Sequence, residues 1–429
     1  MKNLFISLLL LFSFLYTQSQ EPVTSTLNYG NLQKKLEKSD LDIKDAKKAE
    51  LAKTWFVRGE LMQDISDVNI EFLRYGMSTM ETKLFMKEPK EVKTVEESGI
   101  VKQEYIYPRI NLFFENDALT GWKETEVIHP DPLPEGLVAY NKTLDLDTKG
   151  SLDSKVKENL ERMKTQLEAK AIEGFTHGDY AASLKAFENI MEVSKTRVYE
   201  GYIDTIVVYN AALAAKNAGR HDKAIQYFRK SIDMNYGGSV AYYLLKSEYG
   251  IINDSVNVIK TLEEGFKKYP DTSLILIEIV NYYLTIGDAE KGLIYLERAE
   301  KLESNNPSIY FAEGTLYEKS GNKEKALEAY NKAIEIDPEY FNAYFNMGAL
   351  YFNNAVELYE VANKQEDLKE YNASKAIADK ELEKAIPPME KAYEINPTEH
   401  AVLETLQTIY YRLQMLDKYE EIKKKLSEM

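Results

Sequence analysis

The second half of this chain is organised by an interval of 34 residues. The same residue types return at that interval, and the clearest set is four tyrosines: Tyr249, Tyr283, Tyr317 and Tyr351. A period of this length, with small residues at fixed internal places, is typical of helix–turn–helix units stacked into a solenoid. The repeat therefore predicts an all-α protein that presents a long surface to partners.

One unit shows how such a helix pair would pack. Gly314 on the first helix and Ala326 on the second are small enough to let the two helices approach closely, and Tyr330 fills the space beside them. Gly321 ends the first helix and Pro338 stops the second. We interpret these residues as the packing framework of the repeat.

The spacing of these small and large residues resembles that of the tetratricopeptide repeat family. The resemblance implies an α-solenoid, a superhelix whose first helices turn towards an inner groove. The order of features along the whole chain also resembles that of exported tetratricopeptide proteins of Bacteroidota. That second resemblance implies a periplasmic location but carries no defined activity.

The repeats and the segments between them divide the chain into seven regions. In order these are a signal peptide (1–19), an N-terminal capping helix (20–50), a first repeat split by a β-rich insertion at about 66–134 (51–148), a long helix with a repeat (149–204), four contiguous repeats (205–340), a repeat with a lengthened helical hairpin (341–399) and a C-terminal capping repeat (400–429).

The split of the first repeat follows from a change of sequence pattern. Residues 55–62 resemble the first helix of a repeat, but the matching second helix comes only at 137–147. Between them, segments rich in aromatic and β-branched residues alternate with turn formers. We predict a small antiparallel β-meander near residues 100–128.

The late repeat is lengthened rather than split. Tyr351 and Ala385 are 34 positions apart, whereas the matching Tyr317 and Ala326 are 9 apart, so 25 residues are added. The added stretch is charged and free of helix breakers, which predicts a long helical hairpin. Residues 387 and 388 are both proline and must kink or restart the second helix.

The first residues have the composition of a secretory signal peptide. Lys2 precedes an apolar run from Leu4 to Tyr16, and we predict cleavage after Ser19. The alternative is a buried N-terminal helix. The run is too short to cross a bilayer, which takes roughly 20 apolar residues. Because the chain has no cysteine, we expect an exported, periplasmic protein that is neither a lipoprotein nor a membrane-spanning one.

The charge and the motif content exclude several function classes. The formal net charge is −16, which repels phosphate backbones, so we expect no nucleic-acid partner. The sequence contains no P-loop, dinucleotide fingerprint or nucleophile elbow. None of its four histidines pairs with another at metal-ligand spacing. We therefore expect no cofactor, no metal and no enzymatic activity.

Candidate binding residues lie on the first helices of the repeats. Apolar residues, mostly aromatic, recur 34 apart on the predicted inner side: Tyr209, Tyr243, Ile277, Phe311 and Phe345. Three asparagines lie on the same helices: Asn210, Asn281 and Asn346. One interpretation is a floor for a bound peptide. The other is ordinary packing between neighbouring repeats.

Three functions remain open at the level of sequence. We favour a non-enzymatic periplasmic scaffold that binds protein or peptide partners and so holds envelope or secretion components, with outer-membrane complexes among the candidate partners. An alternative is a hydrolase of envelope glycans that uses unmarked carboxylates. A further alternative is a glycan-binding module in which Tyr105, Tyr107 and Trp122 of the meander stack on sugars.

Overall fold

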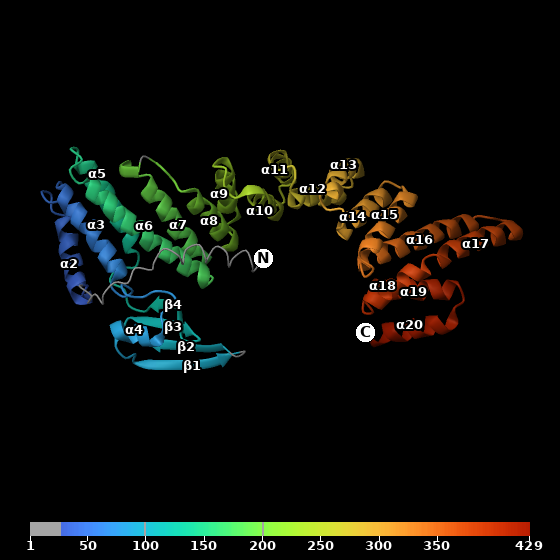
Figure 1. Ribbon diagram of the computed structural model, residues 1–429, viewed down its shortest axis with the longest axis horizontal. Coiled ribbons are helices and arrows are strands. Elements are labelled where there is room, and N and C mark those ends of the chain that lie inside the picture. The colour runs from blue at the N-terminus through green and yellow to red at the C-terminus, as the bar shows by residue number, and fades with distance from the viewer. Residues whose placement is uncertain (1–26, 98–99, 200) are drawn as a thin grey trace. The chain divides into compact units, whose positions relative to one another are not determined.

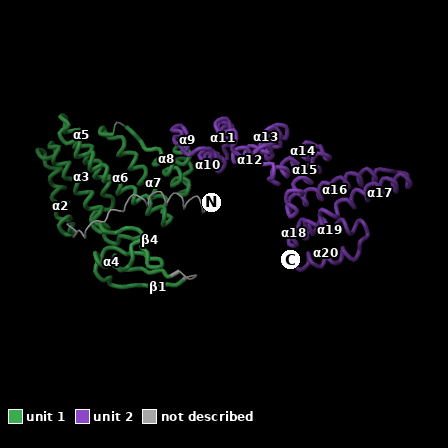
Figure 2. Tube along the Cα trace, viewed as in Figure 1, with its two compact units in different colours: residues 1–227 green, residues 228–429 purple. Residues whose placement is uncertain are grey.

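A computed structural model describes residues 27–97, 100–199 and 201–429. The predicted signal peptide lies outside these residues. The chain separates into two compact units, Met1–Tyr227 and Phe228–Met429, which Figure 2 colours green and purple. Helix α9 (His221–Asp233) crosses the boundary. Each unit is described by itself.

The first unit is a row of helices with a small sheet beneath it in the view of Figure 1. Its helices are α2 (Tyr29–Asp42), α3 (Ala52–Asp67), α4 (Thr79–Met86), α5 (Pro132–Leu146), α6 (Asp153–Thr176), α7 (Tyr180–Ser194) and α8 (Thr205–Asn217), with a short 3-10 helix at Arg197–Tyr199. Helix α6 packs on α7, and α7 packs on α8. The turn between α6 and α7 contains Gly178, which has a positive φ, and Asp179, which caps α7 by accepting a hydrogen bond from the Ala182 amide.

Helices α3 and α5 form one repeat although the sheet is inserted between them. A Cβ atom on Gly59 of α3 would lie closer than 3.0 Å to the ring of Tyr140 on α5, so only glycine allows this approach. The Tyr140 ring is fully buried, and its hydroxyl donates to Oε1 of Gln63 at 2.6 Å. The split repeat is thus closed by a glycine–tyrosine contact.

A buried arginine ties the N-terminal helix to this repeat. Arg58 of α3 is only 4% exposed. Its guanidinium forms ion pairs with Asp40 of α2, at 2.8 Å, and with Glu135 of α5. A buried charge needs such partners to offset the loss of hydration. Arg58 therefore fixes α2 against the α3–α5 pair.

The inserted sheet is larger than the sequence predicted. It contains four antiparallel strands in the order β1-β2-β3-β4: β1 (Glu91–Glu97), β2 (Ile100–Ile106), β3 (Ile110–Glu115) and β4 (Ala118–Glu124). The predicted range of 100–128 missed β1 and extended too far beyond β4. All six described side chains of β1, from Glu91 to Glu96, are exposed, so this strand has no buried face to produce an apolar alternation. The sequence also did not predict α4.

The second unit is a run of helix pairs. Its helices are α10 (Gly238–Ile251), α11 (Ser255–Lys268), α12 (Ser273–Ile286), α13 (Ala289–Leu302), α14 (Pro307–Lys319), α15 (Lys323–Ile336), α16 (Phe341–Ala362), α17 (Leu368–Glu383), α18 (Ile386–Ile395), α19 (His400–Arg412) and α20 (Leu416–Glu428). A Cβ atom on Gly314 would lie closer than 3.0 Å to the Tyr330 ring, and one on Gly348 would clash with Met389. The predicted all-α solenoid with a small β insertion in its first repeat is confirmed.

The lengthened hairpin is formed by α16 and α17, and the chain then restarts in α18. Helix α16 is 22 residues long. The hydroxyl of Tyr359 donates to Oδ1 of Asp379 at 2.5 Å and so joins the two long helices. Pro387 and Pro388 lie in the first turn of α18, where missing amide hydrogens break no helical hydrogen bond. Among the described residues, no helix is both long enough and apolar enough to cross a membrane.

Candidate functional site

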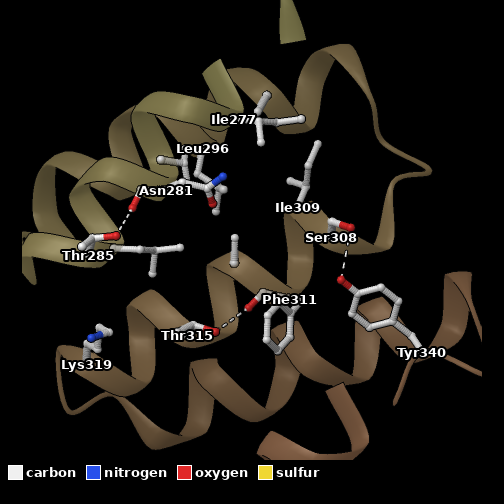
Figure 3. Close-up of a pocket in the computed structure, with 14 residues that line it drawn as sticks. Ile277, Asn281, Thr285, Leu296, Ser308, Ile309, Phe311, Thr315, Lys319 and Tyr340 are labelled. Atoms are coloured by element: carbon white, nitrogen blue, oxygen red, sulfur yellow. Dashed lines mark hydrogen bonds between the residues drawn. The ribbon is translucent and has the colours of Figure 1, made fainter. Parts of the chain in front are cut away.

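A cavity of about 430 Å³ lies between the first helices of two consecutive repeats in the second unit (Figure 3). Its walls are mainly apolar and come from α12, α13 and α14: Ile277, Val280, Leu284, Leu296, Ala299, Ile309, Phe311 and Ala312. Cavities with apolar walls and a few polar groups at the rim are the usual form of a binding site for a side chain or small molecule.

Some polar residues of this cavity already form hydrogen bonds within the protein, and others do not. The hydroxyls of Thr285 and Thr315 donate to backbone oxygens one turn earlier, at 2.8 and 3.0 Å. The hydroxyl of Tyr340 bonds that of Ser308 at 3.1 Å. The side chains of Asn281 and Lys319 are exposed and have no hydrogen-bond or ion-pair partner in the described part of the chain. The cavity therefore offers an amide and an ammonium group to a ligand.

The cavity exists because one repeat lacks the ring that its neighbours carry. Phe311 occupies the equivalent place on α14, and its ring packs against Tyr330 and Tyr340 with centroid distances of 5.9 and 5.8 Å. On α12 the residue at that place is Ile277. A branched aliphatic side chain fills less volume than a phenyl ring, so space remains beside it.

The predicted groove residues lie in different surroundings. Ile277, Asn281 and Phe311 line the cavity together. Phe345 lies outside it and stacks on Phe341 at a centroid distance of 6.0 Å. Tyr243 is half-buried beneath the ammonium group of Lys246, which lies 5.2 Å from the ring centroid.

The remaining three predicted residues are placed as follows. Asn346 donates to the hydroxyl oxygen of Tyr330 at 3.3 Å, so its amide joins α16 to α15. Asn210 is 8% exposed and lies in the first unit together with the half-buried Tyr209. The structure brings these residues into packing positions rather than into the cavity of the second unit.

Of the polar rim, only Asn281 was predicted from the sequence, and Thr285, Thr315 and Lys319 were not. Asn281 and Thr315 are 34 positions apart, and so are Thr285 and Lys319. These pairs lie one and two turns after the Ile277–Phe311 pair on the same helix face. The periodicity that identified the apolar positions, extended by four and eight residues, would have found them.

The sheet does not provide the predicted stacking platform. Tyr105 and Tyr107 are 7% and 4% exposed, and both belong to the apolar core of the insertion with Leu112 and Phe114. Trp122 is 8% exposed, and Tyr75 stacks on it at a centroid distance of 4.9 Å. Tyr105 and Tyr107 therefore cannot belong to the predicted stacking platform, because they lie in the core, and Trp122 exposes only a small part of its ring.

No group of three or more histidine, aspartate or glutamate side chains in the described ranges is arranged to hold a metal ion. Histidines lie apart from one another: His129 contacts Glu135, and His177 bonds the backbone oxygen of Glu173.

Two family models match parts of the chain. A model described as "TPR repeat" matches residues 314–354, and one described as "Tetratricopeptide repeat" matches residues 207–236. The first covers Gly314, Tyr330 and the start of the lengthened repeat. The second covers most of α8 and all of α9.

Curated relatives match the chain over limited lengths. A TPR repeat-containing protein of Methanocaldococcus jannaschii is 30% identical over 200 residues, which is 38% of this chain and 35% of the relative. Anaphase-promoting complex subunit 3 of Schizosaccharomyces pombe is 20% identical over 172 residues, which is 39% of this chain and 25% of the relative. The chain thus spans about a third or less of the length of these relatives.

Solved structures of repeat proteins are similar to parts of the chain. The C-terminal part of a TPR repeat-containing protein from Cytophaga hutchinsonii is 15% identical, with a TM-score of 0.44, over 60% of this chain and 92% of that one. A TPR repeats protein from Bacteroides fragilis is 21% identical, with a TM-score of 0.29, over 58% of this chain and 98% of that one. The predicted resemblance to exported proteins of Bacteroidota stays a prediction. The chain carries repeats of the tetratricopeptide family.

Proposed function

We propose that this protein is a non-enzymatic scaffold that binds partner proteins, and that the cavity between α12 and α14 receives an anchoring side chain of the partner. The observation that carries the proposal is an apolar cavity with an unpaired amide and ammonium group at its rim. Tetratricopeptide repeats are a scaffold for protein–protein interaction, which makes a protein segment the natural occupant.

The walls and the rim define what would bind. The aliphatic wall, with Ile277 and Ile309 on facing helices, suits a large apolar side chain such as leucine, methionine or phenylalanine. Anchors of this kind, buried in a pocket, usually supply most of the binding energy of an interface. The amide of Asn281 can bond the backbone of an extended or helical peptide. Lys319 can bind an acidic group beside the anchor, although the net charge of −16 favours a partner that is neutral or basic elsewhere.

We further propose that the partner is met in the periplasm, among envelope or secretion components or outer-membrane complexes. The support for this location is the apolar run between Leu4 and Tyr16 that follows Lys2. Immunoblotting of periplasmic and cytoplasmic fractions, with N-terminal sequencing of the mature chain, tests it. A cytoplasmic protein that retains Met1–Ser19 would refute the location but would not bear on the cavity between α12 and α14.

The cavity is tested by filling it. Ile277→Phe places a ring where the neighbouring repeats already have one, so the variant should fold. Peptides selected on the wild-type protein from a displayed random library should bind Ile277→Phe at least tenfold more weakly.

Ile286→Phe is the matched control, because Ile286 lies on the same helix, is 55% exposed and does not line the cavity. The control should bind the selected peptides as the wild type does. Equal binding by wild type and Ile277→Phe, with both folded, would refute the assignment of the cavity.

A further inference from the structure

The first unit contains a second cleft, of about 580 Å³, where the inserted sheet approaches α6 and α7. One wall is formed by Phe113 of β3 and Trp122 of β4, and the opposite wall by Leu167, Ala182 and Ala186 of the two helices. In Figure 1, β4 is the strand of the sheet nearest to the helices, and β1 is the farthest. The cleft is thus built by the insertion together with the repeat that follows it.

A close contact between a glycine and a histidine sets the distance between the two walls. The imidazole of His177 lies so near Gly121 of β4 that a Cβ atom on Gly121 would lie closer than 3.0 Å to Nε2. Nδ1 of the same ring donates to the backbone oxygen of Glu173 at 2.9 Å, which fixes the ring. His177 lines the cleft, and Gly121 precedes the lining residue Trp122, so their contact limits how far the two walls can separate or approach.

Several charged groups in the cleft are already bonded. Lys185 pairs with Asp131 at 2.6 Å. Asp179 accepts from the backbone amide of Ala182 at 3.0 Å. Glu124 accepts from the side-chain amide of Asn69 at 2.9 Å. The Lys185–Asp131 and Glu124–Asn69 contacts join separate segments of the unit, whereas Asp179 caps α7.

Five other groups in the cleft have no hydrogen bond or ion pair to any residue that the structure describes. They are the indole N–H of Trp122, the ammonium groups of Lys123 and Lys170, the carboxyl of Glu173 and the amide of Asn189. The Trp122 side chain is 8% exposed, and its N–H is not among the fully buried polar atoms that lack a partner, so a ligand can reach it. The set contains both donors and acceptors.

The charges that line the cleft nearly balance. Lys123, Lys170 and Lys185 are positive, and Glu124, Asp131 and Asp179 are negative. Burial raises the pKa of the Glu173 carboxyl to about 7, where it is half protonated at neutral pH. Lys170 and His177 lower that pKa and Glu124 raises it, by smaller amounts than burial. Tyr75, which stacks on Trp122, also faces Glu173. This arrangement therefore does not favour a strongly charged ligand of either sign.

We propose that this cleft binds a neutral saccharide. Sugars present hydroxyl groups that donate and accept hydrogen bonds around a ring with apolar C–H faces. The indole N–H, ammonium, carboxyl and amide groups match the hydroxyls, and the aromatic wall of Phe113 and Trp122 matches the C–H faces. This site is separate from the partner-binding cavity of the second unit, and its ligand belongs to another chemical class.

The chain offers a direct optical test, because it contains only two tryptophans. Trp55 lies on α3, and its indole N–H donates to the backbone oxygen of Ala49 at 2.8 Å. In a Trp55→Phe background, Trp122 is the only indole. Titration with neutral oligosaccharides of glucose, mannose, galactose, xylose and N-acetylglucosamine should produce a saturable change in emission with at least one of them. The affinity should not change between low and high salt.

Two neighbouring alanines at the start of α7 provide a matched pair of variants. Ala181 and Ala182 are both exposed, but only Ala182 lines the cleft. Ala182→Phe should weaken saccharide binding at least tenfold, whereas Ala181→Phe should leave it unchanged, with both variants folded by circular dichroism. Ile277→Phe should also leave it unchanged, which separates this site from the partner-binding cavity.

Three outcomes would overturn the proposal. The first is that no saccharide in the set changes the emission of Trp122 at millimolar concentration. The second is that Ala182→Phe binds as tightly as Ala181→Phe. The third is that the affinity for the saccharide that binds falls as salt is added, which would identify an ionic site instead.

Discussion

The first repeat and the repeat formed by α14 and α15 are closed by the same contact, although their sequences are arranged differently. Gly59 packs under the ring of Tyr140, and Gly314 packs under the ring of Tyr330. The first pair is 81 positions apart and the second is 16 apart. A fold that depends on contact between two helix faces tolerates an inserted sheet between them, because insertion lengthens only the connecting loop.

The two repeats differ in how the tyrosine hydroxyl is satisfied. Tyr140 donates to Gln63, whose side chain is fully buried. Tyr330 donates to Glu318, at 2.7 Å, and Glu318 is only partly buried. The split repeat has therefore placed a polar network inside its core, whereas the uninterrupted repeat keeps the equivalent bond near water. This difference makes the split repeat the more sensitive one to loss of the hydroxyl.

The largest expected effect comes from replacing the two glycines. Gly59→Leu and Gly314→Leu should each lower the free energy of unfolding by about 1–3 kcal/mol, because the new side chain collides with a buried ring. Urea denaturation gives the loss of stability of each variant, and hydrogen exchange shows which unit loses it. If only Gly314→Leu is destabilising, the split repeat is not closed in the same way.

Gly250 provides the control for these variants. It lies within α10, and a Cβ atom there would meet no atom within 4 Å. Gly250→Leu should stabilise the protein by up to about 1 kcal/mol, because leucine has the higher helix propensity. A large loss at this position would show that leucine itself, and not the collision, causes the effect.

Removal of the tyrosine hydroxyl should destabilise the two repeats to different extents. Tyr140→Phe should cost about 1–3 kcal/mol, because it leaves a buried oxygen of Gln63 without a donor. Tyr330→Phe should cost about 0.5–1.5 kcal/mol, since Glu318 can bond water instead. Chemical denaturation of the two variants gives the comparison. Equal costs would contradict the distinction between a buried and a partly solvated network.

The smallest effect concerns the pH dependence of stability, to which one buried carboxyl in each unit is relevant. Burial raises the pKa of Glu173 from 4.5 to about 7, and burial also raises the pKa of Glu313 on α14. The folded state holds the proton of Glu173 more tightly than the unfolded state does. Its contribution to stability is therefore complete below about pH 4.5 and is lost as the pH rises through 7. Glu173→Gln should flatten the decline of the melting temperature between these values. An unchanged pH profile in Glu173→Gln would show that Glu173 titrates normally.

The sequence predicted those parts of the fold that depend on periodic packing. Gly314, Ala326 and Tyr330 identified a repeat because each of them has an equivalent one period away, and the aromatic segments at 105–107 and 110–114 indicated a sheet because their side chains form its core. Strand β1 was missed because its described side chains are all exposed. An exposed strand has no apolar face from which a period of two can be detected.

The candidate site was predicted in part for a related reason. Ile277, Asn281 and Phe311 lie at periodic positions on first helices and do line one cavity. The cavity itself arises from an exception to the period, an isoleucine where neighbouring repeats have rings. Whether a missing ring leaves space or is compensated by its neighbours depends on three-dimensional packing, which no single position reveals. For the same reason the sequence does not show that the amide of Asn346 donates to the hydroxyl oxygen of Tyr330.

The central functional claim is that a partner lies against the cavity between α12 and α14, and photo-crosslinking tests it most directly. A photoreactive amino acid at Asn281, which is exposed at the cavity, should form adducts with a partner in extracts of the source cells. One at Ile294, which is 61% exposed on α13 and does not line the cavity, should form none. The adducts from position 281 should disappear when Ile277→Phe is added. Adducts from position 294 but none from position 281 would contradict the account.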